Sequence, residues 1–403
     1  MPRAWHIILI AALYALLIPI EAPDFAVYFY PWLDHIHASG PVSAFREPFA
    51  NYSPPYLYLL AAVSVLPIPQ LIMVKLLALV ALAWLAYAVQ RLCIALRIDR
   101  PWAAAMFFLC LPTAILNGPG LGQCDGFWIA PCLLALASAA EKRTGWMAAW
   151  AGAAFAFKPQ AVLMFPLFAV IAVQQKEWRV LLLPPLIYLS AITPAALVGW
   201  PLKDLLLVYG RQAASDFLGN APNLWAIPLS LGYSGSVLAG YAAGAVGAVA
   251  FVLYYFRREL DRDVLLRAAL LGSLLFPFLL PRMHERYFFL ADVLALILVC
   301  RRQDPQSLAI FAAVQIGSLL SILGYLWPSP LANEVGSVVM AGALLALIIS
   351  VARGGTEKGR REHAVPGAPD RGVSRDPAGI SAGRGEQGRL PFDRIVDPGG
   401  ADS

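Results

Sequence analysis

The chain alternates between long apolar runs and short polar turns. Apolar runs of about 13 to 22 residues recur along most of its length, with Arg and Lys clusters at one end and turns rich in Gly, Pro and Trp at the other. A run of about 20 apolar residues is long enough to cross a bilayer as a helix. The pattern therefore predicts an all-α, polytopic membrane protein with about 12 transmembrane helices.

The composition agrees with this prediction. Of the 403 residues, 60% are hydrophobic and 14% are charged, against about 25% charged in a soluble domain. Membrane lipid is therefore an expected partner, because so much apolar surface must face lipid or lie between helices packed in lipid, and soluble enzyme folds are excluded. The formal net charge of +5 is too small to indicate a nucleic-acid partner. The five cysteines lack the spacing of a disulfide framework or a zinc site, so we expect most to be buried apolar residues.

The distribution of positive charge predicts the topology. A first helix near residues 4–20, retained as an anchor, delivers residues 21–70 to the non-cytoplasmic face as the longest outer loop. Segment 54–69 is apolar but short, with prolines at both ends. If it crossed the membrane, every later basic cluster would lie outside, so we predict that it is re-entrant or interfacial. The clusters that then lie in the cytoplasm are Arg91, Arg97 and Arg100, residues 141–143, 176–179, 257–258 and 301–302, and Arg353.

Two parts of the chain differ in composition. Residues 1–352 form the predicted membrane-embedded domain. Residues 353–403 are rich in Gly, Pro, Arg and Asp and contain a single aromatic residue. Such a segment cannot bury enough apolar surface to fold, so we predict a disordered cytoplasmic tail.

The first outer loop opens with an acid close to the membrane boundary. Asp24 follows the first predicted helix by only a few residues. An acid costs about 2.5 to 3.5 kcal/mol at the centre of a membrane helix and less toward the interface, so acids at such depths usually have a role. Asp24 is therefore the leading catalytic candidate. The alternative is a residue at a helix boundary in water.

Two further outer segments carry polar residues that could bind a substrate. Gln123 and Asp125 end the Gly-rich turn 118–125, whose glycines do not match a phosphate-binding loop. Both side chains can bind the hydroxyl groups of a sugar or position the first loop, but the segment can equally be only a turn. Lys158 precedes Pro159 at a break between two short apolar segments, so its charge should face protein or water.

The densest outer cluster is the segment Pro-Arg-Met-His-Glu-Arg-Tyr at 281–287. The Arg side chain presents a fork that matches phosphate, and His adds a donor. Arg282, His284 and Arg286, together with Lys158, therefore form a candidate anion site. The alternative is an Arg–Glu ion-pair network, through Glu285, that locks helices together.

Other polar residues of the first loop are weaker candidates. Asp34 lies ten residues after Asp24, so on a continuous helix the two would point to different sides. His35 and His37, at i and i+2, share no helical face, and we expect no metal site.

One carboxylate and one basic cluster on the same face indicate transfer of a group from a phosphate-linked donor. Nucleotide donors are cytoplasmic, so an outward site needs a membrane-borne donor. A lipid-linked phosphosugar fits this requirement.

Five short motifs occur in order along the chain: D-F-x-x-Y at Asp24–Tyr28, N-Y-x-P-P-x-x-Y at Asn51–Tyr58, G-Q-x-D at Gly122–Asp125, K-P-Q at Lys158–Gln160 and M-H-E-R-Y-F at Met283–Phe288. In order and spacing, they resemble those of the GT-C superfamily of integral-membrane glycosyltransferases. Within it, the chain resembles the polyprenyl-phosphate-sugar-dependent enzymes related to the mannosyltransferases of GPI-anchor assembly. The resemblance covers nearly all of the predicted membrane domain.

The resemblance implies a GT-C-like bundle of about 12 transmembrane helices with a long first outer loop. It also implies an inverting hexosyltransferase that moves a sugar, expected to be mannose, from a polyprenyl-phosphate carrier to a glycan, lipid or protein acceptor. Asp24 matches the family's first-loop acid, which acts as the base. Ala22 occupies the first position of the D-x-D-like pair that many relatives carry, which favours a mechanism without a metal or other cofactor. The expected substrate-binding residues are Tyr28, Tyr52, Gln123, Asp125, Gln160 and Glu285.

The implied location is a plasma membrane, the inner membrane in a bacterium, with the active site facing outward toward cell-envelope glycan. Two alternatives remain. A secondary transporter shares the helical bundle with Pro-broken segments, but its charges should lie at mid-membrane in repeat-related halves. A lipid-linked-glycan polymerase or ligase shares the outward site and would use a glycan on a pyrophosphate carrier.

Overall fold

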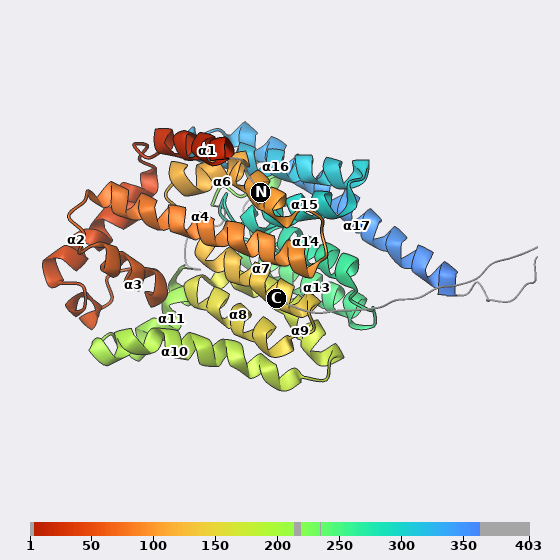
Figure 1. The fold of residues 1–403 in the computed structure, drawn as a ribbon, viewed down its shortest axis with the longest axis horizontal. Coiled ribbons are helices and arrows are strands. Elements are labelled where there is room, and N and C mark those ends of the chain that lie inside the picture. Colours follow the sequence, from red (N-terminus) through yellow and green to blue (C-terminus); the bar gives the residue numbers. More distant parts are fainter. Residues whose placement is uncertain (1–3, 213–218, 234, 363–403) are drawn as a thin grey trace, which may run out of the picture. The chain divides into compact units, whose positions relative to one another are not determined.

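A computed structural model describes residues 4–212, 219–233 and 235–362 of the chain (Figure 1). Every regular element within these ranges is a helix, which confirms the all-α prediction. The α-helices are α1 (Ala4–Leu17), α2 (Tyr30–Ser39), α3 (Pro54–Val63), α4 (Gln70–Ala95), α5 (Pro101–Leu109), α6 (Pro112–Ile115), α7 (Gly126–Ala140), α8 (Thr144–Phe157), α9 (Phe165–Gln174), α10 (Leu183–Val198), α11 (Leu202–Gln212), α12 (Ala226–Ser230), α13 (Val237–Phe256), α14 (Arg262–Leu279), α15 (Phe289–Arg302), α16 (Pro305–Leu326) and α17 (Pro330–Glu362). Two π-helical turns are η1 (Phe25–Phe29) and η3 (Leu116–Gly120), and three 3₁₀ turns are η2 (Ser43–Arg46), η4 (Pro159–Met164) and η5 (Trp178–Leu182).

Five helices in the described ranges are long and apolar enough to cross a membrane. They are Gln70–Ala95, Trp178–Val198, Val237–Phe256, Pro305–Leu326 and Pro330–Arg353. The pair Pro101–Leu109 and Pro112–Gly120, bent by 57°, makes a sixth if it is one span. The chain is therefore a helical membrane protein. A count of about 12 spans would require the shorter apolar helices to cross as well, and it stays a prediction.

Helix α7 lies at the centre of the helical packing. Its residues are buried from Gly126 to Ala139, and it contacts α4 and α8, while α10 packs on α8. Figure 1 shows these four helices side by side. Gly126 allows the close approach of α7 to α4, because a Cβ at this position would lie 2.5 Å from the carbonyl oxygen of Ala81. Helix α14 also contacts α7, and α13 packs on α14, α14 on α15, and α15 on α16.

The structure contains both of the interruptions that the prolines predict. Helix α3 has 10 residues, so it is about 15 Å long and too short to cross a hydrocarbon core of about 30 Å. Helix α8 ends at Phe157, and Lys158 is extended with φ −149° and ψ 142°. A residue that precedes proline is sterically disfavoured in the helical region, which is why the break falls at Lys158.

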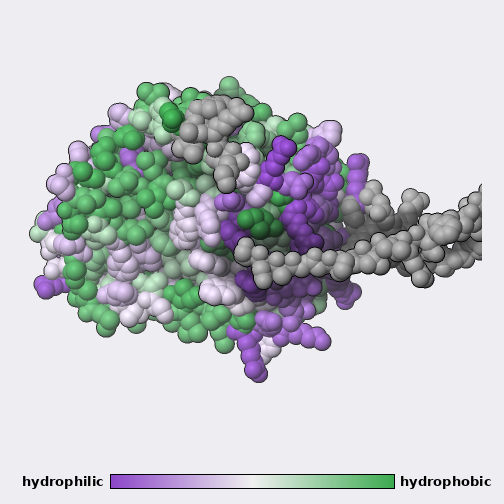
Figure 2. Space-filling model, in the orientation of Figure 1, coloured by the Kyte–Doolittle hydropathy of each residue, from purple (hydrophilic) through white to green (hydrophobic). Residues whose placement is uncertain are grey.

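The predicted cytoplasmic basic clusters meet at one end of the helices. Arg91 pairs with Glu141, the Arg301 side chain donates to the carbonyl oxygen of Leu96, and Arg302 pairs with Asp263. Figure 2 shows a band of hydrophilic side chains at one end of the face in view and apolar side chains over much of the rest. This clustering agrees with a common side for these loops, and the cytoplasm remains the predicted side.

The contacts divide the chain into two units, with the boundary between Thr356 and Glu357. Helix α17 continues to Glu362, past the predicted start of the tail at residue 353. The rest of the predicted tail lies outside the described residues.

Candidate functional site

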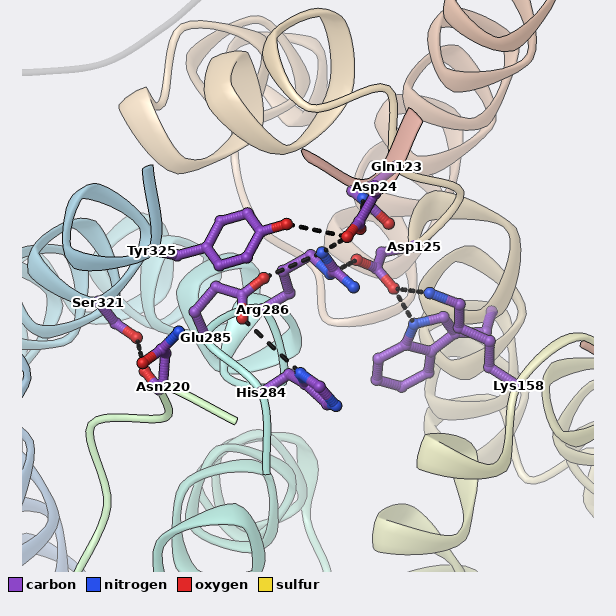
Figure 3. A network of polar contacts seen from close by, with 11 residues as sticks. Asp24, Gln123, Asp125, Lys158, Asn220, His284, Glu285, Arg286, Ser321 and Tyr325 are labelled. Atoms are coloured by element: carbon purple, nitrogen blue, oxygen red, sulfur yellow. Dashed lines mark hydrogen bonds and ion pairs between the residues drawn. The ribbon is translucent and has the colours of Figure 1, made fainter. Parts of the chain in front are cut away.

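Side chains from segments far apart in the sequence converge on one polar cluster (Figure 3). Asp24 precedes η1, Lys158 lies between α8 and η4, and Tyr325 is near the end of α16. Gln123 and Asp125 lie between η3 and α7, and residues 284–286 lie between α14 and α15. Because α7 has 15 residues and ends at the basic loops, the cluster lies about 22 Å from that end. It is therefore at the opposite end of the helices from the basic loops.

Asp24 accepts hydrogen bonds from three side chains. Gln123 Nε2 and Arg286 Nη1 donate to Oδ2 at 2.7 and 3.0 Å, and the Tyr325 hydroxyl donates to Oδ1 at 2.8 Å. Burial raises the pKa of the Asp24 carboxyl, but the charge of Arg286 and the hydrogen bonds outweigh burial and hold the pKa below its ordinary value. Asp24 is thus ionised at neutral pH. Because its side chain is only 14% exposed, the alternative of a helix-boundary residue in water is wrong.

Asp125 and Lys158 form a buried ion pair. Lys158 Nζ lies 2.7 Å from Asp125 Oδ1, and the two side chains are 6% and 2% exposed. Trp128 Nε1 donates to the same oxygen at 3.0 Å. Burial raises the pKa of Asp125, but the charges of Lys158 and Arg286 lower it by more, so the pKa lies below its ordinary value. Burial lowers the pKa of Lys158, but Asp125 more than compensates, so both groups are charged at neutral pH.

Arg286 connects three acids. Its Nη1 lies 2.9 Å from Glu285 Oε1 and 3.0 Å from Asp24 Oδ2, and its Nε lies 3.8 Å from Asp125 Oδ2. Burial raises the pKa of Glu285 above its ordinary value. The ion-pair network considered from the sequence is therefore present, and it includes the predicted catalytic acid. Asp24 and Asp125 already balance Arg286 and Lys158, so these two cations leave no excess positive charge.

The other two predicted phosphate ligands, His284 and Arg282, differ from each other. Burial and the charge of Arg286 lower the pKa of His284 to about 4, so at neutral pH it is uncharged and can add only a hydrogen bond to the candidate anion site. Arg282 is half-buried, and its backbone has a left-handed φ of 61°. None of the ion pairs among the described residues involves Arg282, and its Nε has no acceptor there. Arg282 thus provides a positive charge that no carboxylate among these residues neutralises.

A cavity of about 380 Å³, here called the site cavity, opens beside this cluster. Its lining includes the charged residues Asp24, Lys158, Glu285 and Arg286. The predicted substrate-binding residues Tyr28, Tyr52 and Gln160 also line it. Gln123 and Asp125, 2% and 1% exposed, lie behind its wall, where they hold Asp24 and Lys158.

A second pocket of about 160 Å³, here called the Arg282 pocket, adjoins the site cavity. The two share Gln160, His284 and Tyr287. The rest of the Arg282 pocket is mainly apolar, and its lining includes Val162, Leu163, Leu280, Pro281 and Met283. It therefore combines an apolar wall with a cation, Arg282, that pairs with no carboxylate among the described residues.

A buried lysine outside the cavity positions two segments of the site. Lys75 is 1% exposed, and its Nζ donates to the carbonyl oxygens of Pro119 and Gly120, each at 2.6 Å. The same nitrogen lies 5.2 Å from the ring centroid of Phe25, the residue after Asp24. Gly122 completes the contact, because its φ is 70° and a Cβ would lie 2.8 Å from the Phe25 ring. Lys75 thus fixes the turn before Gln123 against the segment that carries Asp24.

Several residues of the site were not predicted from the sequence. Tyr325 lies in an apolar span, so nothing in its local sequence indicates that it binds Asp24. Gly219 donates its N–H to the carbonyl oxygen of Met283 at 2.9 Å and accepts from the N–H of Glu285 at 3.1 Å. A Cβ at Gly219 would lie 2.6 Å from His284 Nδ1, so only glycine fits there. The only local sequence feature that could have indicated a role for Gly219 is the Gly-Asn pair that it forms with Asn220.

The weaker candidates lie outside the cluster. Asp34 is exposed and accepts a hydrogen bond from Gln70 at 2.7 Å, while His35 and His37 contact the backbone oxygens of Ala44 and Ser64. Within the described ranges, no three His, Cys, Asp or Glu side chains are grouped so as to hold a metal ion. Three of the five cysteines are buried, as expected: Cys93, Cys124 and Cys132.

The sequence matches no model of a known protein family and no curated protein. The fold and the site define a class of protein by themselves. It is a helical membrane protein with a charged, substrate-sized cavity at the end opposite its basic loops.

Proposed function

We propose that the protein is a glycosyltransferase that moves a sugar, with mannose as the expected one, from a polyprenyl-phosphate carrier to an acceptor on the non-cytoplasmic face. One observation carries the proposal: an ionised carboxylate, Asp24, lines a cavity that adjoins an apolar pocket, and that pocket holds an arginine, Arg282, which pairs with no carboxylate among the described residues. A sugar bound to a lipid phosphate has the same three parts, namely a polar sugar, an anion and an apolar chain.

In this reaction the acceptor hydroxyl oxygen attacks the anomeric carbon of the donor sugar. A new C–O bond forms while the bond from the anomeric carbon to the phosphate oxygen breaks, and its electron pair leaves with the phosphate. The hydroxyl proton passes to the Asp24 carboxylate. Arg282 binds the departing phosphate by charge-assisted hydrogen bonds, and neutral His284 can add one donor.

Asp24 is a weak base, since its pKa lies below the ordinary value. The weak base suffices if proton transfer is late, when the attacking oxygen has already become acidic against an oxocarbenium-like carbon. Arg286 can assist the transfer, because the same atom, Nη1, makes its short contacts to both Asp24 and Glu285. When Asp24 takes the proton, its attraction for Arg286 weakens, and the guanidinium group can shift toward Glu285 and the phosphate.

The aliphatic lining of the Arg282 pocket suits the part of the carrier chain next to the phosphate, whereas the predicted re-entrant or interfacial segment 54–69 lines neither this pocket nor the site cavity. The pocket's aliphatic side chains offer a prenyl group the apolar surface that it prefers over water.

The test is a transfer assay with purified protein, a synthetic polyprenyl-phosphate mannose and a panel of acceptors. Asp24→Asn keeps the shape of the side chain but cannot take the proton, so turnover should fall by about 10² to 10⁴ while donor binding persists. Asp34→Asn is the matched control, because Asp34 is an exposed acid of the same loop. Near-normal transfer by Asp24→Asn would contradict the role of Asp24. Solute uptake into proteoliposomes, without transfer by the wild type, would favour the transporter.

A further inference from the structure

A third pocket adjoins the site cavity on the side of the first outer loop. This pocket, here called the loop pocket, has a volume of about 420 Å³, within the range of about 300–1,000 Å³ that is usual for small-molecule sites. It shares Tyr28, Trp32 and Asn51 with the site cavity and no lining residue with the Arg282 pocket. The site cavity therefore has two different neighbours, and Asp24 is four residues from the shared Tyr28.

The loop pocket is lined by aromatic rings and polar groups. Tyr28 lies 5.7 Å from Trp32 between ring centroids, and Phe49 lies 5.6 Å from Trp200. Asn51 and Asp204 add an amide and a carboxylate. Trp200 is 2% exposed, and its indole N–H has no acceptor among the described residues. A buried donor without an acceptor is costly unless a bound group accepts its hydrogen bond.

We infer that the loop pocket is the acceptor subsite and that the acceptor is a carbohydrate, an inference that rests on the proposed function. The faces of aromatic rings are negative and attract the weakly positive C–H groups of a pyranose ring. The amide and the carboxylate match its hydroxyl groups. Few side chains of this pocket are aliphatic, in contrast with the Arg282 pocket, so a lipid chain fits it less well. A peptide would need an extended groove or a free sheet edge.

The two pockets give the reaction a direction. The donor phosphate binds beside Arg282, and the acceptor sugar enters past Tyr28 and Trp32, next to Asp24. The hydroxyl therefore reaches the anomeric carbon from the side of the base, and the phosphate leaves toward a pocket that shares no lining residue with the loop pocket. Separate entry and exit are what an inverting transfer needs. The electron pair of the broken bond stays with the phosphate, and the hydroxyl proton goes to Asp24.

Saccharide binding tests the inference without any catalysis. Trp32 and Trp200 line the loop pocket, so their fluorescence should change when the purified protein is titrated with mannose, glucose, galactose and N-acetylglucosamine, each also as its methyl glycoside. Phe49→Leu removes a stacking face and should raise the Kd of the best saccharide roughly three- to tenfold. Phe45→Leu is the matched control, because Phe45 belongs to the same loop and packs on Phe49 but does not line the pocket.

The transfer assay provides the second measurement. Phe49→Leu and Asp204→Asn should raise the KM for a saccharide acceptor while the KM for the polyprenyl-phosphate sugar stays unchanged. Transfer to a serine peptide or a lipid alcohol, but not to a saccharide, would overturn the inference and leave the proposed function standing. Absence of saccharide binding, or equal binding by wild type and Phe49→Leu with an unchanged melting midpoint, would overturn it as well. Saccharide binding without transfer by the wild type would support the subsite and contradict the proposed function.

Discussion

The buried pair of Asp125 and Lys158 allows the sharpest test of how the site is held together. At 2.7 Å and an effective dielectric constant of about 20, the gross attraction is about 6 kcal/mol. Removing one partner leaves a buried charge and usually costs about 3–5 kcal/mol. Lys158→Met should lower the free energy of unfolding by about 3 kcal/mol, the low end of this range. The reason is that Arg286 Nε, 3.8 Å from Asp125, still offsets part of the negative charge of Asp125.

The double variant separates the pair from its surroundings. Asp125→Asn with Lys158→Met removes both charges and should recover a large part of the loss, because a buried pair replaced as a whole is often nearly neutral. The assay is unfolding by titration with SDS in mixed micelles, analysed as a double-mutant cycle. The control is the pair of Arg91 and Glu141, 3.5 Å apart and about one-third exposed, whose removal should cost less than about 1 kcal/mol. A coupling energy below about 0.5 kcal/mol for Asp125 and Lys158 would refute the reasoning.

Three further predictions concern the topology, the histidine and the tail. Single cysteines at positions 143 and 258 of a cysteine-free protein should react with a membrane-impermeant label only from the cytoplasmic side, and labelling from outside would invert the assignment. His284 is neutral in the folded protein because its pKa is lowered to about 4 from 6.5. Between about pH 6.5 and 4 the unfolded chain therefore binds a proton at this histidine that the folded protein does not, so the unfolding free energy should fall as the pH drops through this range. His284→Gln should flatten that part of the stability profile, and an unchanged slope would contradict it. Removal of residues 363–403 should leave transfer intact, because their composition provides too little apolar surface to form a packed core. Loss of activity at normal expression would count against this.

Features that depend on local composition and charge could be predicted from the sequence alone. Long apolar runs required a helical membrane protein, since backbone polar groups in lipid must be satisfied within helices. Pro159 predicted the break at Lys158, because the residue before proline avoids the helical region. The sequence also indicated Asp24 and the cluster 282–286 as candidates, since charges at the membrane boundary are costly unless they have a role.

Which of these charged residues pair with one another could be seen only in the tertiary structure. Asp24 and Arg286 are 262 residues apart and Asp24 and Tyr325 are 301 apart, so no local pattern could show that they pair. Burial and neighbouring charges determine a pKa, and for this reason His284 is neutral although it lies in the candidate anion site predicted from the sequence. The fold also pairs Lys158 and Arg286 with acids, whereas Arg282 has no acid partner among the described residues. Electrostatic energy depends on separation and burial, which the order of residues along the chain does not contain.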